Sequence, residues 1–182
     1  MLLASPPDDA RTAAVTTREA HPPDAPLVHR IYLATPAYFE IISIPIPTLA
    51  EVSTDLATAA DDPRRHAELV LIERPPDSGV EPTILDPATG RHVVGYLDYK
   101  LDYPEEGDAT VNLLLVLPSV QGRGIGGACA RDLERRLEGR SRRMLASIYG
   151  DNPRARRFWE RLGFSFAIDA KPVLDWYAKP LT

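Results

Sequence analysis

The chain has 182 residues, of which 44% are hydrophobic and 26% are charged, as in an ordinary soluble globular protein. Its formal net charge of −5 argues against a nucleic-acid-binding protein, because such proteins usually present a basic surface. No apolar run is long enough to span a bilayer, and the N-terminus does not have the pattern of a signal peptide. We therefore expect a cytoplasmic protein with neither a nucleic acid nor a membrane as partner.

Cysteine and histidine usage gives no indication of a metal site. The single cysteine, Cys129, cannot form an intramolecular disulfide, and its place among small residues on an apolar stripe predicts a packed core thiol. The four histidines show no metal-ligand spacing, so no metal is expected. They are His21, His29, His66 and His92.

The N-terminal part of the chain predicts a tail, a strand and two helices. Residues 1–13 are rich in Pro, Asp and Ala and predict a disordered tail, which leaves a single domain over 14–182. Alternation over 14–19 predicts a first strand. Asp24 is placed to cap a helix that Thr35-Pro36 interrupts. The buried face of that helix is expected to consist of Leu27, Val28, Ile31 and Tyr32.

An apolar segment with two prolines follows, and then a second helix. Thr48 and Glu51 form a capping box that predicts the start of this helix. A strand is expected over 67–73, and a long loop over 74–91, where prolines and glycines are frequent. The next strand is expected over 91–101, with Gly95 as a bulge.

The middle of the chain has a strand, a glycine-rich loop and a helix in succession. An unbroken apolar run over 113–117 ends at Pro118 and predicts a strand that is buried on both faces. A glycine-rich loop over 121–127 leads into an amphipathic helix. The N–H groups of the first helical turn lack partners, and glycines let an anion approach them closely, so this arrangement favours phosphate binding. The apolar stripe of the helix consists of Ile125, Cys129, Leu133 and Leu137.

The C-terminal part predicts a strand over 143–149 and a helix that Asn152 caps and Gly163 ends. Two closing strands are expected over 164–169 and 174–177. The apolar segment 173–177 leaves a homodimer through a sheet edge open.

Two phosphate-binding patterns compete in the glycine loop. Gly122, Gly124 and Gly127 match G-x-G-x-x-G, and Asp151 follows the next strand, as in an NAD-dependent oxidoreductase. Against this interpretation, the first glycine is separated from the strand by several residues, and too few residues follow Asp151 to complete a doubly wound sheet. We set it aside.

The second pattern is Gln-x-x-Gly-x-Gly at Gln121, Gly124 and Gly126, preceded by V-x-P at 116–118. A further segment over 152–164 matches N-x-x-A-x-x-F-[YW]-x-x-x-G-F. Together the two blocks resemble the GNAT superfamily of N-acetyltransferases. The resemblance implies a mixed α/β (α+β) fold, with a mostly antiparallel central sheet of six or seven strands flanked by about four helices.

The resemblance also implies that acetyl-CoA is the cosubstrate. The pantetheine arm is then expected to pair with the backbone of the central strand, and the N–H of Val116 to stabilise the developing oxyanion. Asn152 and Phe158 are expected near the cofactor. The implied backbone partners are Leu115, Val116 and Leu117, and the implied pyrophosphate loop comprises Gln121, Gly122, Arg123, Gly124, Ile125, Gly126 and Gly127.

Proton-transfer groups are less clearly marked. Trp159 stands where many members of the family have a tyrosine, so Tyr149 and Tyr38 are candidate substitutes as proton donor. Asp98 and Asn112 are candidate catalytic residues, because each interrupts an apolar strand, where a polar group needs a partner or a function. The resemblance implies that the N-terminal helices partly cover the acceptor site, where the candidate substrate-binding residues are Tyr38 and Phe39.

The predicted function is acetyl transfer from acetyl-CoA to a primary amine of a small molecule or peptide, by direct attack in a ternary complex. The alternatives are a catalytically weak acyl-CoA-binding module, consistent with Trp159, and the less favoured oxidoreductase. The sequence leaves the acceptor, the length of the acyl group and the oligomeric state open.

Overall fold

The protein is described here from a computed structural model that covers residues 14–74, 84–171 and 174–181. The expected tail over 1–13 lies outside the described residues. Within them, no helix combines the length and apolar character that crossing a membrane requires.

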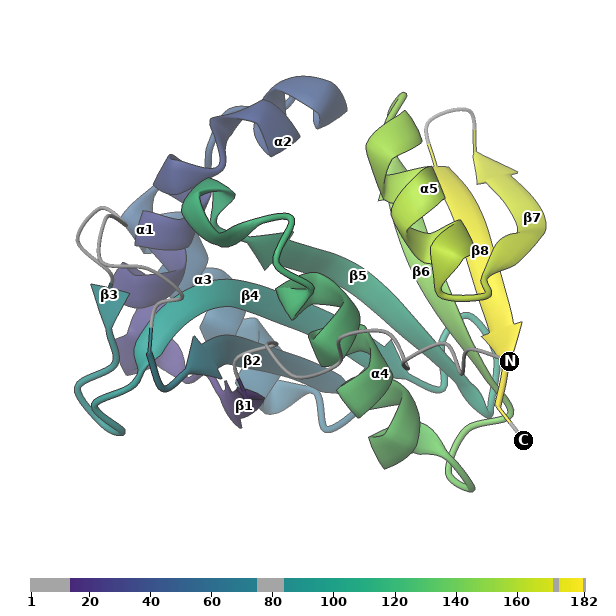
Figure 1. Ribbon diagram of the computed structural model, residues 1–182, viewed down its shortest axis with the longest axis horizontal. Coiled ribbons are helices and arrows are strands. Elements are labelled where there is room, and N and C mark those ends of the chain that lie inside the picture. The colour runs from purple at the N-terminus through teal and green to yellow at the C-terminus, as the bar shows by residue number, and fades with distance from the viewer. Residues whose placement is uncertain (1–13, 75–83, 172–173, 182) are drawn as a thin grey trace, which may run out of the picture.

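An 8-stranded sheet forms the centre of the molecule, in the order β1-β2-β4-β5-β6-β8-β7, with β3 paired to β4 off this path (Figure 1). Neighbouring strands are antiparallel except β5 and β6, which are parallel. The predicted mostly antiparallel fold is confirmed, and a doubly wound parallel sheet is not what these strands form. The strands are β1 (Val15–Glu19), β2 (Arg65–Ile72), β3 (Ile84–Leu85), β4 (His92–Leu101), β5 (Asp108–Val116), β6 (Arg143–Tyr149), β7 (Ser165–Lys171) and β8 (Leu174–Pro180).

Five α-helices flank the sheet in the described ranges, one more than the sequence predicted. The additional helix begins at Pro36, whose fixed φ suits a first helical turn, and ends before Ser43 in the left-handed region at φ 57°. The capping box of Thr48 and Glu51 is confirmed. The helices are α1 (Ala25–Ala34), α2 (Pro36–Ile42), α3 (Leu49–Asp61), α4 (Ile125–Leu137) and α5 (Pro153–Arg161), with short 3-10 turns η1 (Pro22–Asp24) and η2 (Pro118–Val120).

The helices cover both faces of the sheet. Tyr32 of α1 packs edge-on against Tyr96 of β4, with ring centroids 5.9 Å apart, on the face that α1 and α3 share. On the other face, Arg136 of α4 donates to both carboxylate oxygens of Glu68 in β2 at 2.8 and 2.9 Å. Cys129 of α4 is buried in the core beneath this helix, as predicted. The sheet is thus the middle layer of three.

Two sequence-based predictions about strands were wrong. The range 74–91 is not all loop, because Ile84 and Leu85 pair with Val93 and His92 of β4. The C-terminal segment is not a sheet edge, because β8 lies between β6 and β7 and pairs with both. A homodimer through this edge therefore has no free strand to use; residue 173 lies outside the described ranges.

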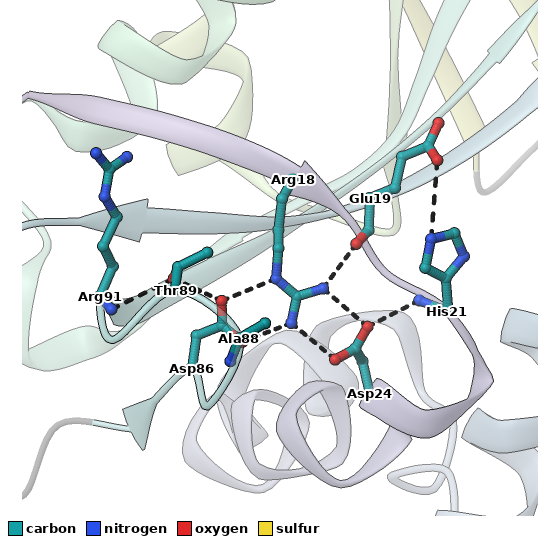
Figure 2. Close-up of polar contacts among 8 residues, drawn as sticks. All are labelled: Arg18, Glu19, His21, Asp24, Asp86, Ala88, Thr89 and Arg91. Atoms are coloured by element: carbon teal, nitrogen blue, oxygen red, sulfur yellow. Dashed lines mark hydrogen bonds and ion pairs between the residues drawn. The ribbon is translucent and has the colours of Figure 1, made fainter.

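A partly buried ion cluster fixes the start of α1 relative to the sheet (Figure 2). The guanidinium of Arg18 in β1 donates to both oxygens of Asp86 at 2.8 and 2.6 Å, and to both oxygens of Asp24 at 2.9 and 2.7 Å. Asp86 has 0% exposure and also accepts from Thr89 Oγ1 at 2.6 Å. Since Asp24 is the N-cap of α1 and Asp86 follows β3, the cluster joins three segments that are distant in sequence.

The charge of Arg18 sets the ionisation of its two partners. Its hydrogen bonds hold the pKa of Asp24 and that of Asp86 below the ordinary value. An unfolded chain therefore binds protons at these carboxyls before the folded protein does. Their contribution to stability is present above about pH 4 and is lost as the pH falls further.

Replacing Arg18 with methionine tests this cluster. Because Asp24 and Asp86 are then left facing each other without a cation, R18M is expected to lower the free energy of unfolding at pH 7 by about 3 kcal/mol. The deficit should shrink below about pH 4, where both carboxyls become protonated in the variant. Urea unfolding at pH 7 and below about pH 4 measures this loss of stability.

The matched control is R64M, which removes an exposed ion pair to Asp62 (3.3 Å) and should cost less than about 1 kcal/mol. Equal losses of stability in R18M and R64M would contradict the role of the Arg18 cluster.

Candidate functional site

The central strands β5 and β6 separate partway along their length. Their parallel register runs from Asp108↔Arg143 to Val111↔Ala146 and ends there. Beyond this point the two strands diverge toward their carboxyl ends, between the start of α4 and α5 (Figure 1). In the second half of β5, the backbone groups that point toward β6 therefore have no paired strand. We call this gap between β5 and β6 the seam.

The direction of the β5 backbone groups follows from a single hydrogen bond. The N–H of Leu117 donates to the carbonyl of Val94 at 2.8 Å, on the β4 side. Because backbone groups alternate in direction along a strand, those of Leu115 also face β4, whereas those of Leu114 and Val116 face the seam. Of the three residues expected to pair with pantetheine, only Val116 therefore presents its backbone to the seam; Leu114, which was not among the three, does so as well.

The glycine loop at the end of β5 leads into a helix N-terminus with no side-chain cap. Gly124, at φ 79°, is the N-cap residue of α4, and as a glycine it provides no side chain to cap the N–H groups of the first turn. Gly122 has φ 76°, and a Cβ at this position would meet no protein atom within 4 Å. Uncapped N–H groups and the positive end of the helix dipole together attract an anion.

Gln121 connects the loop to both sides of the seam. Its Nε2 donates to the carbonyl oxygen of Val116 at 2.7 Å, and its Oε1 accepts from Arg154 of α5 at 2.6 Å. The seam-facing carbonyl of Val116 is thereby occupied, which leaves the N–H of that residue as the available donor. Arg123 is exposed in the same loop, whereas the side chain of Ile125 belongs to the core.

The remaining residues expected near the cofactor lie on or just before α5. A Cβ on Gly126 would lie 3.3 Å from Phe158, so the ring of Phe158 packs directly on the first turn of α4. Asn152 caps α5, with its Oδ1 accepting from the N–H of Ala155 at 3.0 Å. Gly127 instead lies against the side chain of Arg131.

A cavity of about 390 Å³ opens beside β5 on the α1 face of the sheet. It brings together four of the predicted site residues, Tyr38, Asp98, Asn112 and Tyr149, which come from α2, β4, β5 and β6. Phe39 does not line it; this ring is 4% exposed and packs against Tyr32 at 5.1 Å. The other lining residues, which the sequence did not single out for the site, are Tyr32, Ile42, Ile44, Arg65, Tyr96 and Leu113.

Asp98 is 3% exposed and is held by two donors. Its Oδ1 accepts from Nδ2 of Asn112 at 2.8 Å, and its Oδ2 accepts from Nε of Arg65 at 2.9 Å. The register between β4 and β5 shifts just after Asp98. The two polar residues that interrupt apolar strands, Asp98 and Asn112, are hydrogen-bonded to each other across these strands. Burial raises the pKa of the Asp98 carboxyl above its ordinary value, although the donors oppose this. A raised pKa makes the carboxylate a stronger base.

Trp159 and Tyr149 have different surroundings. Trp159 is 5% exposed and packs against Phe158 and Phe164, each at 4.9 Å, so the indole belongs to the core. Tyr149 is 38% exposed at the carboxyl end of β6 and lines the cavity. Burial, Tyr103 and Asp98 raise its pKa, in that order, so the phenol keeps its proton at neutral pH and can donate it.

Helix α2 forms a wall of the cavity through Tyr38 and Ile42 and also touches the end of β6. Gly150, at φ 65°, lies so close that a Cβ would be 2.6 Å from the carbonyl oxygen of Ile41. Helix α2 could have been predicted from Pro36, because proline is typical of a first helical turn.

Comparison with known proteins shows the family and the fold. Residues 49–164 match the model of the acetyltransferase (GNAT) family. A search of curated proteins finds no match. The crystal structure of an acetyltransferase from Thermus thermophilus is 38% identical, with a TM-score of 0.80, and the alignment covers 93% of this chain and 99% of that one.

More distant structures share the fold. An aminoglycoside acetyltransferase in complex with coenzyme A is 18% identical over 92% of this chain and 95% of its own, with a TM-score of 0.69. A spermidine N-acetyltransferase from Vibrio cholerae, with CoA and spermine, is 12% identical over 91% of this chain and 95% of its own, with a TM-score of 0.66.

The loop can be tested with two alanine substitutions. Gly122 and Gly139 both have a positive φ and open space around them, at φ 76° and 72°. Both G122A and G139A should lower the free energy of unfolding by about 1 kcal/mol, because alanine is strained in this region. Only G122A is expected to weaken the binding of coenzyme A, by about tenfold, because its methyl group enters the loop where the anion would approach. Calorimetric titration with coenzyme A measures this, and equal dissociation constants for the two variants would contradict the placement of the pyrophosphate.

Proposed function

The chain belongs to the acetyltransferase (GNAT) family, and from this premise we propose that it transfers the acetyl group of acetyl-CoA to a primary amine of a small molecule or peptide. The strongest support is that one strand, β5, borders both the seam and the cavity. Asn112 and Leu113 of β5 line the cavity, while Leu114 and Val116 of the same strand face the seam. An acyl donor in the seam would therefore end beside Asp98.

The chain's own groups are placed for binding the donor. The uncapped first turn of α4 receives the pyrophosphate, with Gly122 and Gly124 letting it approach the backbone. The N–H of Val116, nearest the loop, pairs with an amide of the pantetheine arm. The N–H of Leu114 is further from the loop and follows the cavity-lining Leu113, so it, rather than that of Val116, donates to the thioester oxygen as negative charge develops there.

Two residues of the cavity accept and donate the protons of the reaction. A primary amine is an ammonium ion in neutral water, so it must lose one proton before its lone pair can attack; Asp98 accepts that proton. The new C–N bond forms at the thioester carbon, and the C–S bond then breaks. A second proton passes from the nitrogen to solvent, and Asp98 releases the first one to solvent. Tyr149 supplies a proton to the departing sulfur, and solvent returns the phenol to its protonated state. The products are the amide, the free thiol of CoA and one proton in solution.

The acceptor enters from the side of α1, α2 and α3. Tyr38 lines this entrance, whereas Phe39 supports it from the core. Proteins with the same fold are named for an aminoglycoside and for spermidine as acceptors, and both compounds have primary amines. The weak acyl-CoA-binding alternative rested on Trp159, but the cavity holds a buried carboxylate and a phenol that do not depend on that position. We therefore favour an enzyme.

Asp98→Asn tests the proposed base. Because the amide keeps the shape of the carboxylate but cannot accept the proton, kcat/KM for the amine should fall by about 100-fold. The loss of wild-type activity as the pH falls through the raised pKa of Asp98 should also be missing from the variant. Release of free thiol from acetyl-CoA follows the reaction.

Glu68→Gln is the matched control for this variant, since Glu68 is a buried, arginine-paired carboxylate on the opposite face of the sheet. It should lower the melting temperature and leave kcat/KM unchanged. Full activity in D98N, or an equal loss in E68Q, would contradict the assignment.

A further inference from the structure

Tyr96 presents a buried hydroxyl that the fold does not satisfy. The residue lies in β4, is 1% exposed and lines the same cavity as Asp98. Its phenolic oxygen has no hydrogen-bond partner among the described residues. Buried hydroxyls are nearly always paired, and an unpaired one lowers stability, so a group from outside the chain is the natural partner.

The surroundings of this hydroxyl are those of the cavity. Burial raises the pKa of Tyr96, and the charges of Asp98 and Asp55 and the phenol of Tyr32 raise it further, so the hydroxyl stays neutral at physiological pH. Tyr96 and Asp98 are two positions apart on β4, with no register shift between them, and they face the same side of the sheet. A ligand in the cavity is therefore on the side of the sheet to which both Asp98 and Tyr96 belong, and both residues line its walls.

We propose that the Tyr96 hydroxyl binds the acceptor amine, and that the cavity selects a primary ammonium group on an apolar stem. This inference rests on the proposed function. The ammonium has three N–H donors, of which one goes to Asp98 and one to the oxygen of Tyr96. The cavity is lined by four tyrosines, whose rings also attract a cation; they are Tyr32, Tyr38, Tyr96 and Tyr149.

The apolar stem follows from a second cavity, of about 420 Å³, which shares Tyr32 and Ile44 with the first. Its two acids are already engaged: Asp55 accepts two hydrogen bonds from Arg65, at 2.9 and 2.8 Å, and Glu51 caps α3. The remaining walls are mostly aliphatic, which favours a hydrocarbon or aryl stem over a second ammonium group. They include Ile44, Pro45, Ile46, Pro47 and Val52.

The test compares the wild type with Y96F, using acetyl-CoA and 2-phenylethylamine, spermidine or an aminoglycoside as acceptor. The wild type should acetylate 2-phenylethylamine with the lowest KM of the three. Y96F should raise that KM by about tenfold and leave the KM for acetyl-CoA unchanged. Its melting temperature should be unchanged or higher, because no hydrogen bond within the protein is lost.

Tyr99→Phe is the matched control on the same strand. The hydroxyl of Tyr99 donates to Glu68 at 3.2 Å on the opposite face of the sheet, so Y99F should lower the melting temperature and leave both KM values unchanged. An unchanged KM for 2-phenylethylamine in Y96F would overturn the role of Tyr96. A lower KM for spermidine or the aminoglycoside in the wild type would overturn the apolar stem.

A binding measurement separates this inference from the proposed function. 2-Phenylethylamine is titrated calorimetrically into wild type and Y96F, each saturated with CoA. Binding that depends on Tyr96 without any acetyl transfer would overturn the proposed function and support the site. Transfer that is insensitive to Y96F would overturn the site alone. Neither binding nor transfer with any of the three amines would overturn both.

Discussion

The divergence of β5 from β6 is the constraint on which the rest of the site depends. Parallel strands normally continue to exchange hydrogen bonds, and backbone groups left without partners cost free energy unless water or a ligand satisfies them. Here the register stops at Val111↔Ala146, although both strands continue. The glycine loop and the start of α4 lie at the end of one strand, and α5 lies beside the other. The parts that would hold an extended, amide-rich ligand are therefore organised by one interrupted pairing.

The proposed chemistry takes place where this seam meets the cavity that holds Asp98. Asp98 is buried, and its two oxygens each accept one hydrogen bond, from Asn112 and Arg65, which fixes the carboxylate in place. Arg65 also binds Asp55 of α3, so the position of this base depends on the packing of the N-terminal helices. The cluster around Arg18 has a related effect further away, because it fixes the start of α1, which contributes Tyr32. The ion pairs of Arg65 and Arg18 therefore hold cavity-lining residues in position as well as stabilising the fold.

Features that depend on local chemistry could be predicted from the sequence. The glycine loop, the capping box at Thr48 and the N-cap at Asn152 each follow from neighbouring residues, and all are found in the structure. Asp98 and Asn112 were identified because polar residues in apolar strands need partners, and each is hydrogen-bonded to the other.

Features that depend on the arrangement of distant segments were missed. The position of β8 between β6 and β7 is a property of the sheet order, and β8 has no local signal for it. Which backbone groups of β5 face the seam depends on the register with β4. In the sequence Tyr96 resembles any core aromatic residue; only the structure shows that its hydroxyl has no partner among the described residues and that it lines the cavity of Asp98. Helix α2 is short, and Thr35-Pro36 predicted only an interruption of the preceding helix, although proline also favours a first helical turn.

Amide hydrogen exchange, resolved residue by residue by NMR with and without coenzyme A, tests the central claim most directly. If the seam is the cofactor site, coenzyme A should slow the exchange of the Leu114 and Val116 amides, which face β6. The amides of Leu115 and Leu117 face β4 and should change little, since that of Leu117 is already bonded to Val94. Protection that alternates along the strand would support a ligand paired between β5 and β6. Unchanged exchange at both Leu114 and Val116 in the presence of saturating coenzyme A would contradict it.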